Sequence, residues 1–216
     1  MTTPTRTADD LAIATLALAF ATDPGMRWLL PDPDRYHRGF PDLVRLAGGE
    51  GFEAGTVDVL EHGAAVAVWV PPGAAQDEEG WARLFTDHVD PERLEAVFAW
   101  GAEVERHHPS EPHWYLAVLG VDPHRQGGGL GTRLLRAGLE RCDRDMLPAY
   151  LESANPRNRV LYERHGFEVF AEIQVADAPP IWPMRRPARA PRAPEPTLPP
   201  RVVGDDASPS RPVSPG

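Results

Sequence analysis

The chain has 216 residues, of which 42% are hydrophobic and 25% are charged, a balance typical of a globular protein with a substantial buried core. Its formal net charge of −10 argues against a general nucleic-acid binder, because a phosphate backbone requires a basic surface. The single cysteine, Cys142, excludes an intramolecular disulfide, and we predict that it packs in the core and belongs to no metal site.

The first predicted element is a buried helix that starts after Thr7. Asp9 and Asp10 stand in its first turn, where acids favour a helix start, and Asp23-Pro24-Gly25 is expected to end it. The apolar run 11–21 has the length of a signal-peptide core, but acids precede it where a signal needs positive charge. No stretch reaches the ~18 apolar residues that span a membrane. We therefore expect a cytoplasmic protein that does not enter the membrane.

The next elements are a turn over residues 29–34, a helix over 36–46 and two strands over 56–60 and 64–70. Glu61-His62-Gly63 separates the two strands and predicts a hairpin. Two helical patterns follow within residues 76–108, broken at Asp90-Pro91. Apolar residues recur in them at spacings that suit buried helix faces, and we predict core roles for them rather than contacts with a substrate: Trp81, Phe85, Leu94, Phe98 and Trp100.

The second half alternates strands and helices. Strands are predicted over residues 113–121, 149–152 and 167–175, and helices over 129–144 and 156–165. This alternation predicts an α/β (α+β) fold with at least one parallel strand pair. Residues 187–216 contain nine prolines and little that can be buried. We therefore expect one domain over residues 1–187 and a disordered Pro/Arg-rich tail over 188–216.

A glycine-rich turn lies between the strand over 113–121 and the helix that follows it. Glycines at such a place let backbone N–H groups approach an anion, and the helix N-terminus adds a positive dipole end. A nucleotide-triphosphate loop needs a lysine, and the chain has none. A dinucleotide fingerprint needs glycine or alanine at the sixth position, where counting from Gly127 gives Thr132 and from Gly129 gives Leu134. The turn therefore predicts a site for another kind of phosphate.

Two motifs resemble those of the GNAT acetyltransferase superfamily. Gln126-x-x-Gly129-x-Gly131 is similar to its coenzyme A pyrophosphate loop. Asn155 and Tyr162, followed by Gly166-Phe167, are similar to its second signature. Segments 64–69, 110–121, 148–167 and 182–185 further resemble puromycin N-acetyltransferase and its actinobacterial relatives. Gly128 departs from the basic residue that many relatives carry, the first strand of the family is expected to be short or missing, and residues 71–108 match poorly.

The resemblance implies a GNAT fold with a mixed sheet of about six to seven strands, splayed at the cofactor site and flanked by helices. It implies acetyl-CoA as co-substrate, and direct attack by an amine in a ternary complex. The pyrophosphate would meet backbone amides of the turn, and Arg125, Arg133 and Arg136 are available for outer phosphates. The pantetheine arm would meet the end of the preceding strand and Asn155. Val121 is also a candidate oxyanion donor. The implied cofactor-binding residues are Leu119, Gly120, Val121, Arg125, Gln126, Gly127, Gly128, Gly129, Leu130, Gly131, Thr132, Asn155 and Tyr162.

For catalysis, the resemblance implies Tyr162 as the proton donor to the departing thiolate. Glu152, at the end of its strand, and His113, at the start of the central strand, are the candidate bases. The expected acceptor is a primary amine of a small molecule, with an aminonucleoside or another antibiotic among the candidates. Two alternatives stay open, a protein or peptide N-acetyltransferase and a non-catalytic CoA-binding module. The oligomeric state is open between monomer and homodimer.

Overall fold

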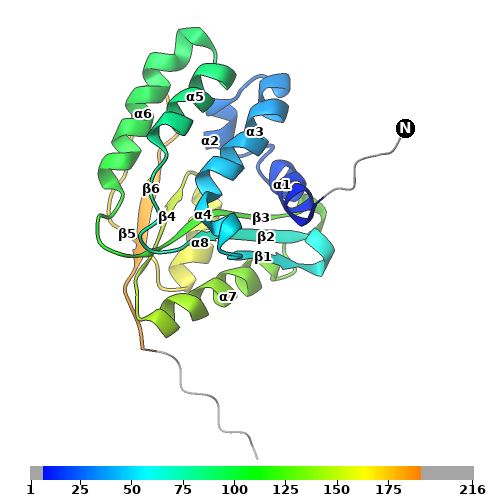
Figure 1. The fold of residues 1–216 in the computed structure, drawn as a ribbon, viewed down its shortest axis with the longest axis vertical. Helices are drawn as coiled ribbons and strands as arrows, with labels where there is room; N and C mark the ends of the chain where they lie inside the picture. Colours follow the sequence, from blue (N-terminus) through cyan, green and yellow to red (C-terminus); the bar gives the residue numbers. More distant parts are fainter. Residues whose placement is uncertain (1–6, 191–216) are drawn as a thin grey trace, which may run out of the picture.

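The computed structural model describes residues 7–190, in which helices cover both faces of one six-stranded sheet (Figure 1). The strands are β1 (Val57–Leu60), β2 (Ala65–Val70), β3 (Trp114–Val121), β4 (Ala149–Ser153), β5 (Glu168–Val169) and β6 (Trp182–Arg186). The helices are α1 (Ala8–Ala19), α2 (Pro24–Leu29), α3 (Pro33–Gly48), α4 (Glu50–Glu53), α5 (Glu78–His88), α6 (Leu94–His107), α7 (Leu130–Asp145) and α8 (Pro156–Arg164). No helix of this part of the chain is long and apolar enough to cross a membrane.

The strand order is β1-β2-β3-β4-β6-β5, and β3 and β4 run parallel while the other neighbours run antiparallel. The predicted mixed sheet and its parallel pair are therefore confirmed. The predicted hairpin is confirmed as well, with Leu60 opposite Ala65 across Glu61–Gly63. Residues 191–216, most of the predicted tail, lie outside the described residues.

Of two sequence predictions about the first helix, its start is confirmed and its end is wrong. Thr7 caps α1 as predicted, in a reciprocal pair of hydrogen bonds with Asp10 of 3.1 Å each. Asp23-Pro24-Gly25, however, starts α2 instead of ending the first helix. The Asp23 carboxylate accepts from the N–H groups of Gly25 and Met26, and Pro24 takes the first helical position, where it loses no hydrogen bond.

The predicted strand over residues 167–175 is wrong in its length. Only Glu168–Val169 pair as β5, followed by an isolated bridge between Ile173 and Ile181. The chain turns at Ala176, which has a φ of +47°, and returns as β6. No strand was predicted over β6, and Pro183 locally argues against a strand inside a sheet. The Pro183 carbonyl nevertheless accepts from the N–H of Phe170, at 3.2 Å.

The sheet separates two hydrophobic cores. Alternate residues of β2 point to opposite faces, so that Val66 and Val68 enter the core beneath α1 and α3, whereas Ala67 and Trp69 enter the core beneath α7. Opposite β2, β3 carries an irregular register around Ala117. A bulge of this kind changes which face the following side chains take, and bulges are frequent beside functional sites.

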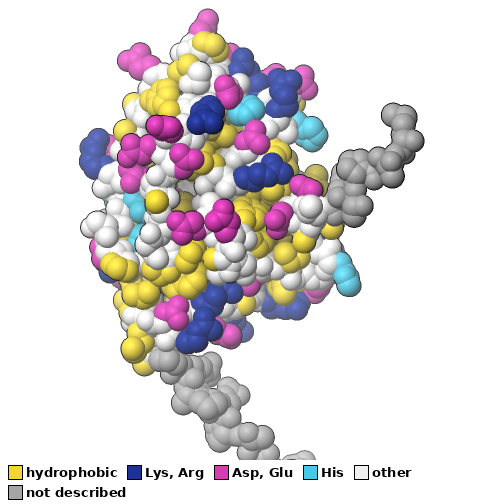
Figure 2. Space-filling view, in the orientation of Figure 1, with side chains coloured by type: hydrophobic (Ala, Val, Ile, Leu, Met, Phe, Trp, Pro, Cys, Tyr) yellow, Lys and Arg dark blue, Asp and Glu magenta, His cyan; other side chains and the backbone are white. Residues whose placement is uncertain are grey.

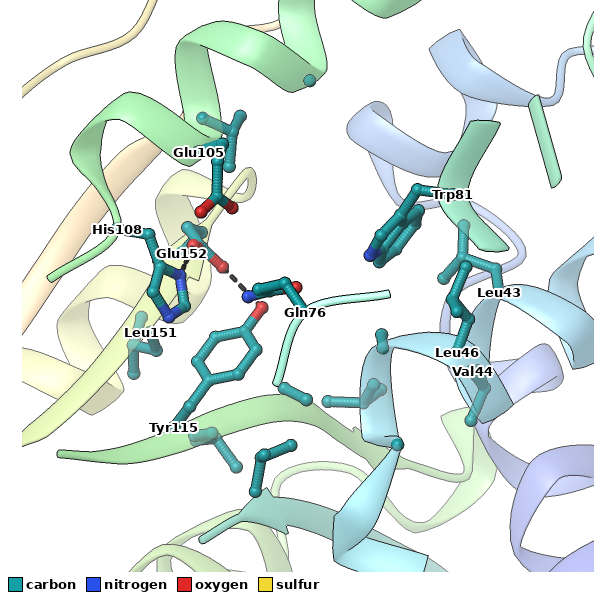
Figure 3. A pocket seen from close by; sticks show the side chains of 18 of the residues that line it. Leu43, Val44, Leu46, Gln76, Trp81, Glu105, His108, Tyr115, Leu151 and Glu152 are labelled. Carbon is teal, nitrogen blue, oxygen red and sulfur yellow. Dashed lines mark hydrogen bonds and ion pairs between the residues drawn. The ribbon is translucent and has the colours of Figure 1, made fainter. Parts of the chain in front are cut away.

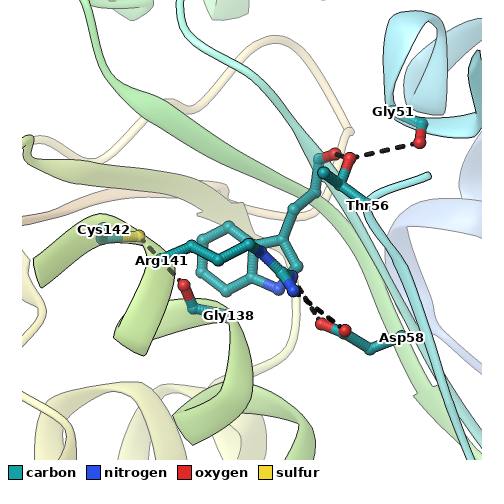
Figure 4. Close-up of polar contacts among 7 residues, drawn as sticks. Gly51, Thr56, Asp58, Gly138, Arg141 and Cys142 are labelled. Atoms are coloured by element: carbon teal, nitrogen blue, oxygen red, sulfur yellow. Dashed lines mark hydrogen bonds and ion pairs between the residues drawn. The ribbon is translucent and has the colours of Figure 1, made fainter. Parts of the chain in front are cut away.

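The second core depends on a close approach between β2 and α7 (Figure 4). Trp69 is completely buried, and a Cβ at Gly138 would lie 2.1 Å from its indole ring. Next to this contact Arg141 forms a bidentate pair with Asp58, at 3.0 and 2.5 Å. Gly138 is therefore the residue that lets α7 lie flat on the sheet.

Candidate active site

The strands β3 and β4 separate soon after they meet. They pair only at Trp114 with Ala149 and at Tyr115 with Tyr150. Beyond these pairs β3 continues to Val121 along β2, while β4 continues to Ser153 along β6. The predicted splay is therefore present in the one parallel pair of the described sheet.

A cavity of about 810 Å³ opens at this splay, within the range of small-molecule sites. Residues of β3, β4, α3, α5, α6 and α8 contribute to its wall. Its charged lining is mostly acidic, with a single arginine, Arg45, against seven carboxylates, and Figure 2 shows Asp and Glu side chains gathered over hydrophobic surface on one face. The seven are Asp23, Glu50, Glu53, Asp77, Glu78, Glu105 and Glu152.

Glu152 is a carboxylate of β4 at the splay, and it has contacts on two sides. The Tyr115 hydroxyl donates to its carboxylate at 2.6 Å, and Nδ1 of His108 lies 3.5 Å from the other oxygen (Figure 3). The side chains of Glu152 and His108 are 13% and 15% exposed. Burial, followed by the charge of Glu152, raises the pKa of Tyr115 well above its usual range, so this phenol stays a donor.

Two further side chains pack beside this cluster. The His113 ring lies 5.0 Å from that of His108, between centroids, and its Nδ1 is 2.7 Å from the carbonyl oxygen of Glu111. Burial lowers the pKa of His113, so the ring is neutral at pH 7 and its Nε2 is the nitrogen able to accept a proton. Tyr150 is fully buried, and its hydroxyl makes no hydrogen bond to a described residue.

Tyr162 lines the same cavity from α8. Its side chain is 7% exposed and meets Phe167 edge to face, with ring centroids 6.0 Å apart. Burial, and then the charge of Asp23, raises the pKa of Tyr162 above its ordinary value. Asn155 caps α8 by accepting from the N–H of Arg157 at 3.1 Å, and it also lines the cavity. A protonated phenol and an amide are thus placed on one side of the cavity.

The glycine-rich turn lies outside the cavity, at the exposed start of α7. Gly127 and Gly129 have φ values of +79° and +82°, and no atom lies within 4 Å of where their Cβ atoms would stand. Gly129 is the N-cap of α7 and no side chain caps it, so the first N–H groups of this helix are available to an anion. The Gln126 side chain donates to the Val121 carbonyl at 3.2 Å and ties the turn to the end of β3.

Two arginines beside this turn already have a partner. Arg125 and Arg133 both contact the carboxylate of Glu61, the latter at 2.8 Å. Glu61 lies on the hairpin between β1 and β2 and has a φ of +48°, a conformation that residues other than glycine rarely adopt. An anion at the turn would compete with Glu61 for these guanidinium groups.

The structure brings part of the predicted site together. The cavity is lined by Tyr162, Glu152, His113, Asn155 and Leu119. Gly120, Val121 and the turn from Arg125 to Thr132 are not part of its wall. Packing alone also accounts for the glycine at position 120, because a Cβ there would lie 2.8 Å from Leu16 of α1.

Sequence reasoning missed three polar residues of the cavity, Glu105, His108 and Tyr115. Tyr115 could have been predicted, because it stands two residues after His113 and its side chain therefore lies on the same face of the strand. Glu105 and His108 stand at the end of α6, and only the packing of that helix against the sheet brings them to β4. The predicted core role of the aromatic residues is also incomplete, since Trp81, Phe85, Phe98 and Trp100 line the cavity.

Comparison with known proteins supports the GNAT acetyltransferase family. The family model described as "Acetyltransferase (GNAT) family" matches residues 66–167. An uncharacterized N-acetyltransferase of Schizosaccharomyces pombe is 30% identical over 129 residues, which are 50% of each chain. A mycothiol acetyltransferase of Salinispora arenicola is 39% identical over 100 residues, 43% of this chain and 32% of that one. The chain thus covers half or less of these curated relatives.

The fold is similar to that of a solved acetyltransferase structure. A Corynebacterium glutamicum structure described as histone acetyltransferase HPA2 and related acetyltransferase aligns with a TM-score of 0.59 and 25% identity, over 87% of this chain and 96% of the other. The family model and these relatives show that this part of the chain resembles GNAT acetyltransferases, which use acetyl-CoA as co-substrate. The relatives named here do not include puromycin N-acetyltransferase, so that closer resemblance stays a prediction.

Proposed function

Starting from the GNAT acetyltransferase family, we propose that this chain transfers the acetyl group of acetyl-CoA to a primary amine of a small molecule, an aminonucleoside or another antibiotic among the candidates. The observation that carries the proposal is the convergence of Glu152 and Tyr162 on one cavity at the splay of β3 and β4. A direct transfer to an ammonium substrate requires a base and an acid, and a carboxylate and a protonated phenol can fill these two roles.

The cofactor enters from the turn. In this proposal the backbone N–H groups from Gln126 to Thr132 hold the pyrophosphate at the start of α7, whose uncapped end suits an anion. Leu119, at the free edge of β3, and Asn155 both line the cavity and would hold the pantetheine arm of acetyl-CoA. The acidic lining repels the phosphates, which keeps them at the turn and outside the cavity.

Glu152 is the proposed base. The acceptor arrives as an ammonium ion and must lose a proton before its nitrogen attacks the acetyl carbonyl carbon. Glu152 accepts this proton, directly or through water, while Tyr115 and His108 hold the carboxylate in place. His113 is the alternative base, because its neutral ring lines the cavity and its Nε2 is able to accept a proton.

Tyr162 is the proposed acid. As the new carbon–nitrogen bond forms, the carbon–sulfur bond breaks and its electron pair stays on the sulfur of CoA. Tyr162 gives its phenolic proton to this thiolate and recovers one from solvent or from the attacking nitrogen. Its raised pKa keeps the phenol protonated until this moment.

The test is the release of CoA thiol from acetyl-CoA, measured with a thiol-reactive dye and a panel of amines that includes puromycin. Release that depends on one small amine supports the proposal, and release driven by puromycin adds the closer resemblance. Release with peptides alone identifies a peptide N-acetyltransferase. Acetyl-CoA binding by calorimetry without release for any acceptor of the panel indicates a CoA-binding module.

A further inference from the structure

The cavity has two walls of opposite character, which Figure 3 shows on opposite sides of Gln76. The polar wall consists of Glu105, His108, Tyr115 and Glu152, and the apolar wall of Leu43, Val44, Leu46 and Trp81. A ligand that fills the space between them must be charged or polar at one end and apolar at the other.

The apolar wall continues into an aromatic cluster, defined here as Trp81, Phe85 and Phe98. Trp81 and Phe85 have ring centroids 5.7 Å apart, and Phe98 meets Phe85 edge to face at 5.6 Å. All three line the cavity, yet Phe98 is 42% exposed. A large aromatic side chain left open on the wall of a cavity is a surface for a ring of the ligand.

The polar wall has an unused negative charge. Asp23 and Asp77 cap helices, and Glu50 accepts from the N–H of Ala75 at 3.2 Å. Glu152 contacts Tyr115 and His108. Glu105, the other carboxylate of the polar wall, is drawn near Glu152 in Figure 3, and the charges of both raise the pKa of Tyr115 after the larger effect of burial. None of the arginines or histidines of residues 7–190 is within ion-pair distance of Glu105. A cation between Glu105 and Glu152 would complete this wall.

We propose that the acceptor is an aromatic monoamine, whose ammonium group binds between Glu105 and Glu152 and whose ring packs on the aromatic cluster. This inference rests on the proposed function, because it names the substrate class of the same site. The charge of the cavity wall attracts the ammonium ion, and the ring supplies apolar area to Trp81, Phe85 and Phe98.

The same walls disfavour the other common amines. A polyamine would place its aliphatic chain against Trp81 and Leu43, where it gains less than a ring does, and Asp77 and Glu50 beyond them already accept from backbone N–H groups. A peptide would place backbone N–H and C=O groups against the same apolar surface, where they would lose water without gaining a partner. An aliphatic monoamine brings no second charge and no backbone polar groups to the apolar wall, but it gains less from the aromatic rings than an aromatic monoamine does.

The first experiment measures equilibrium binding in the presence of CoA, which prevents turnover. 2-Phenylethylamine, n-hexylamine, spermidine and trialanine amide are titrated into the full chain by calorimetry. We expect 2-phenylethylamine to bind about tenfold more tightly than any of the other three. Spermidine or the peptide binding as tightly as 2-phenylethylamine would overturn the inference, and so would the absence of binding by all four.

The second experiment compares variants. Trp81→Leu keeps apolar bulk and is expected to weaken the binding of 2-phenylethylamine about tenfold while changing that of n-hexylamine less than about twofold. Trp28→Leu is the matched control, because Trp28 is partly buried nearby but does not line the cavity. Equal losses for both amines in Trp81→Leu would contradict the aromatic contact.

Failure of this inference and failure of the proposed function are distinguishable. Selective binding of 2-phenylethylamine without CoA thiol release would leave the aromatic amine site and remove the acetyl transfer. CoA thiol release with spermidine or the peptide, but not with 2-phenylethylamine, would leave the transfer and remove the aromatic amine.

Discussion

Replacement of Tyr162 by phenylalanine separates chemistry from folding. The variant keeps the ring that packs edge to face on Phe167 at 6.0 Å, and it removes only the hydroxyl of a side chain that is 7% exposed. We therefore expect the free energy of unfolding to change by about 1 kcal/mol or less. Acetyl-CoA affinity should stay within about twofold, because the proton transfer occurs only after the ternary complex has formed.

Turnover should respond far more strongly. A positioned general acid contributes roughly 10²- to 10⁴-fold, which corresponds to about 2.7–5.4 kcal/mol of transition-state stabilisation. The assay is CoA thiol release followed with a thiol-reactive dye. Cys142 does not interfere, because it is fully buried and burial raises the pKa of its thiol to about 12.

Tyr36→Phe is the matched control for this experiment. Tyr36 is a buried tyrosine whose hydroxyl donates to the Ala17 carbonyl at 2.7 Å, and it does not line the cavity. Its replacement should lower the free energy of unfolding by about 1 kcal/mol and leave turnover nearly unchanged. If Tyr162→Phe turned over acetyl-CoA within about twofold of the parent chain, Tyr162 would not be the acid.

Four further changes test the remaining arguments. Glu152→Gln should lower kcat/KM about 100-fold near pH 7. Part of the activity should return at alkaline pH, where the amine loses its proton without help. A loss that is the same at every pH would contradict the role of Glu152 as the base. Glu61→Gln should free Arg125 and Arg133 and tighten acetyl-CoA binding several-fold at low salt, as measured by calorimetry, whereas unchanged affinity would show that neither guanidinium reaches a phosphate. Because the pKa of His113 is lowered in the folded state, the unfolded chain binds more protons just below pH 6.5. The free energy of unfolding is therefore fully retained above this pH and falls as the pH decreases. In urea unfolding, His113→Asn should show a weaker fall of this free energy with decreasing pH, and parallel curves for the two chains would refute the effect. Gly138→Ala should lower the free energy of unfolding by about 1–3 kcal/mol, because its Cβ would overlap Trp69. At Gly128 the nearest atom to an added Cβ is 3.6 Å away, so Gly128→Ala should leave the free energy of unfolding nearly unchanged.

The sequence predicted the parts of the fold whose signals are local. Thr7 and Asp10 identify the start of α1, and the hairpin and the glycine turn are marked by residues with special backbone conformations. The strand β6 could not be predicted in the same way, because Pro183 contradicts a strand locally. Pairing with β4 and β5 overrides this local preference.

The same distinction between local and non-local signals applies to the residues of the candidate site. Tyr162, Glu152 and Asn155 were identified from a motif or a strand end, and the structure brings all three to one cavity. His108 and Glu105 carry no local signal, because their role depends on where the end of α6 meets β4. Trp81 and Phe98 follow a helical period that also fits a buried face, and a period alone does not distinguish a core from a cavity wall.

The strand order has a consequence for the making of this protein. The strand β6 is the last that the ribosome produces among the described ones, yet it lies between β4 and β5 and pairs with all five residues of β4. Until Trp182–Arg186 emerge, the strand that carries Glu152 has an open edge, which is a surface for pairing with other chains. A premature stop codon before residue 182 would therefore release a chain with an exposed strand edge, and we expect such products to aggregate or to be degraded.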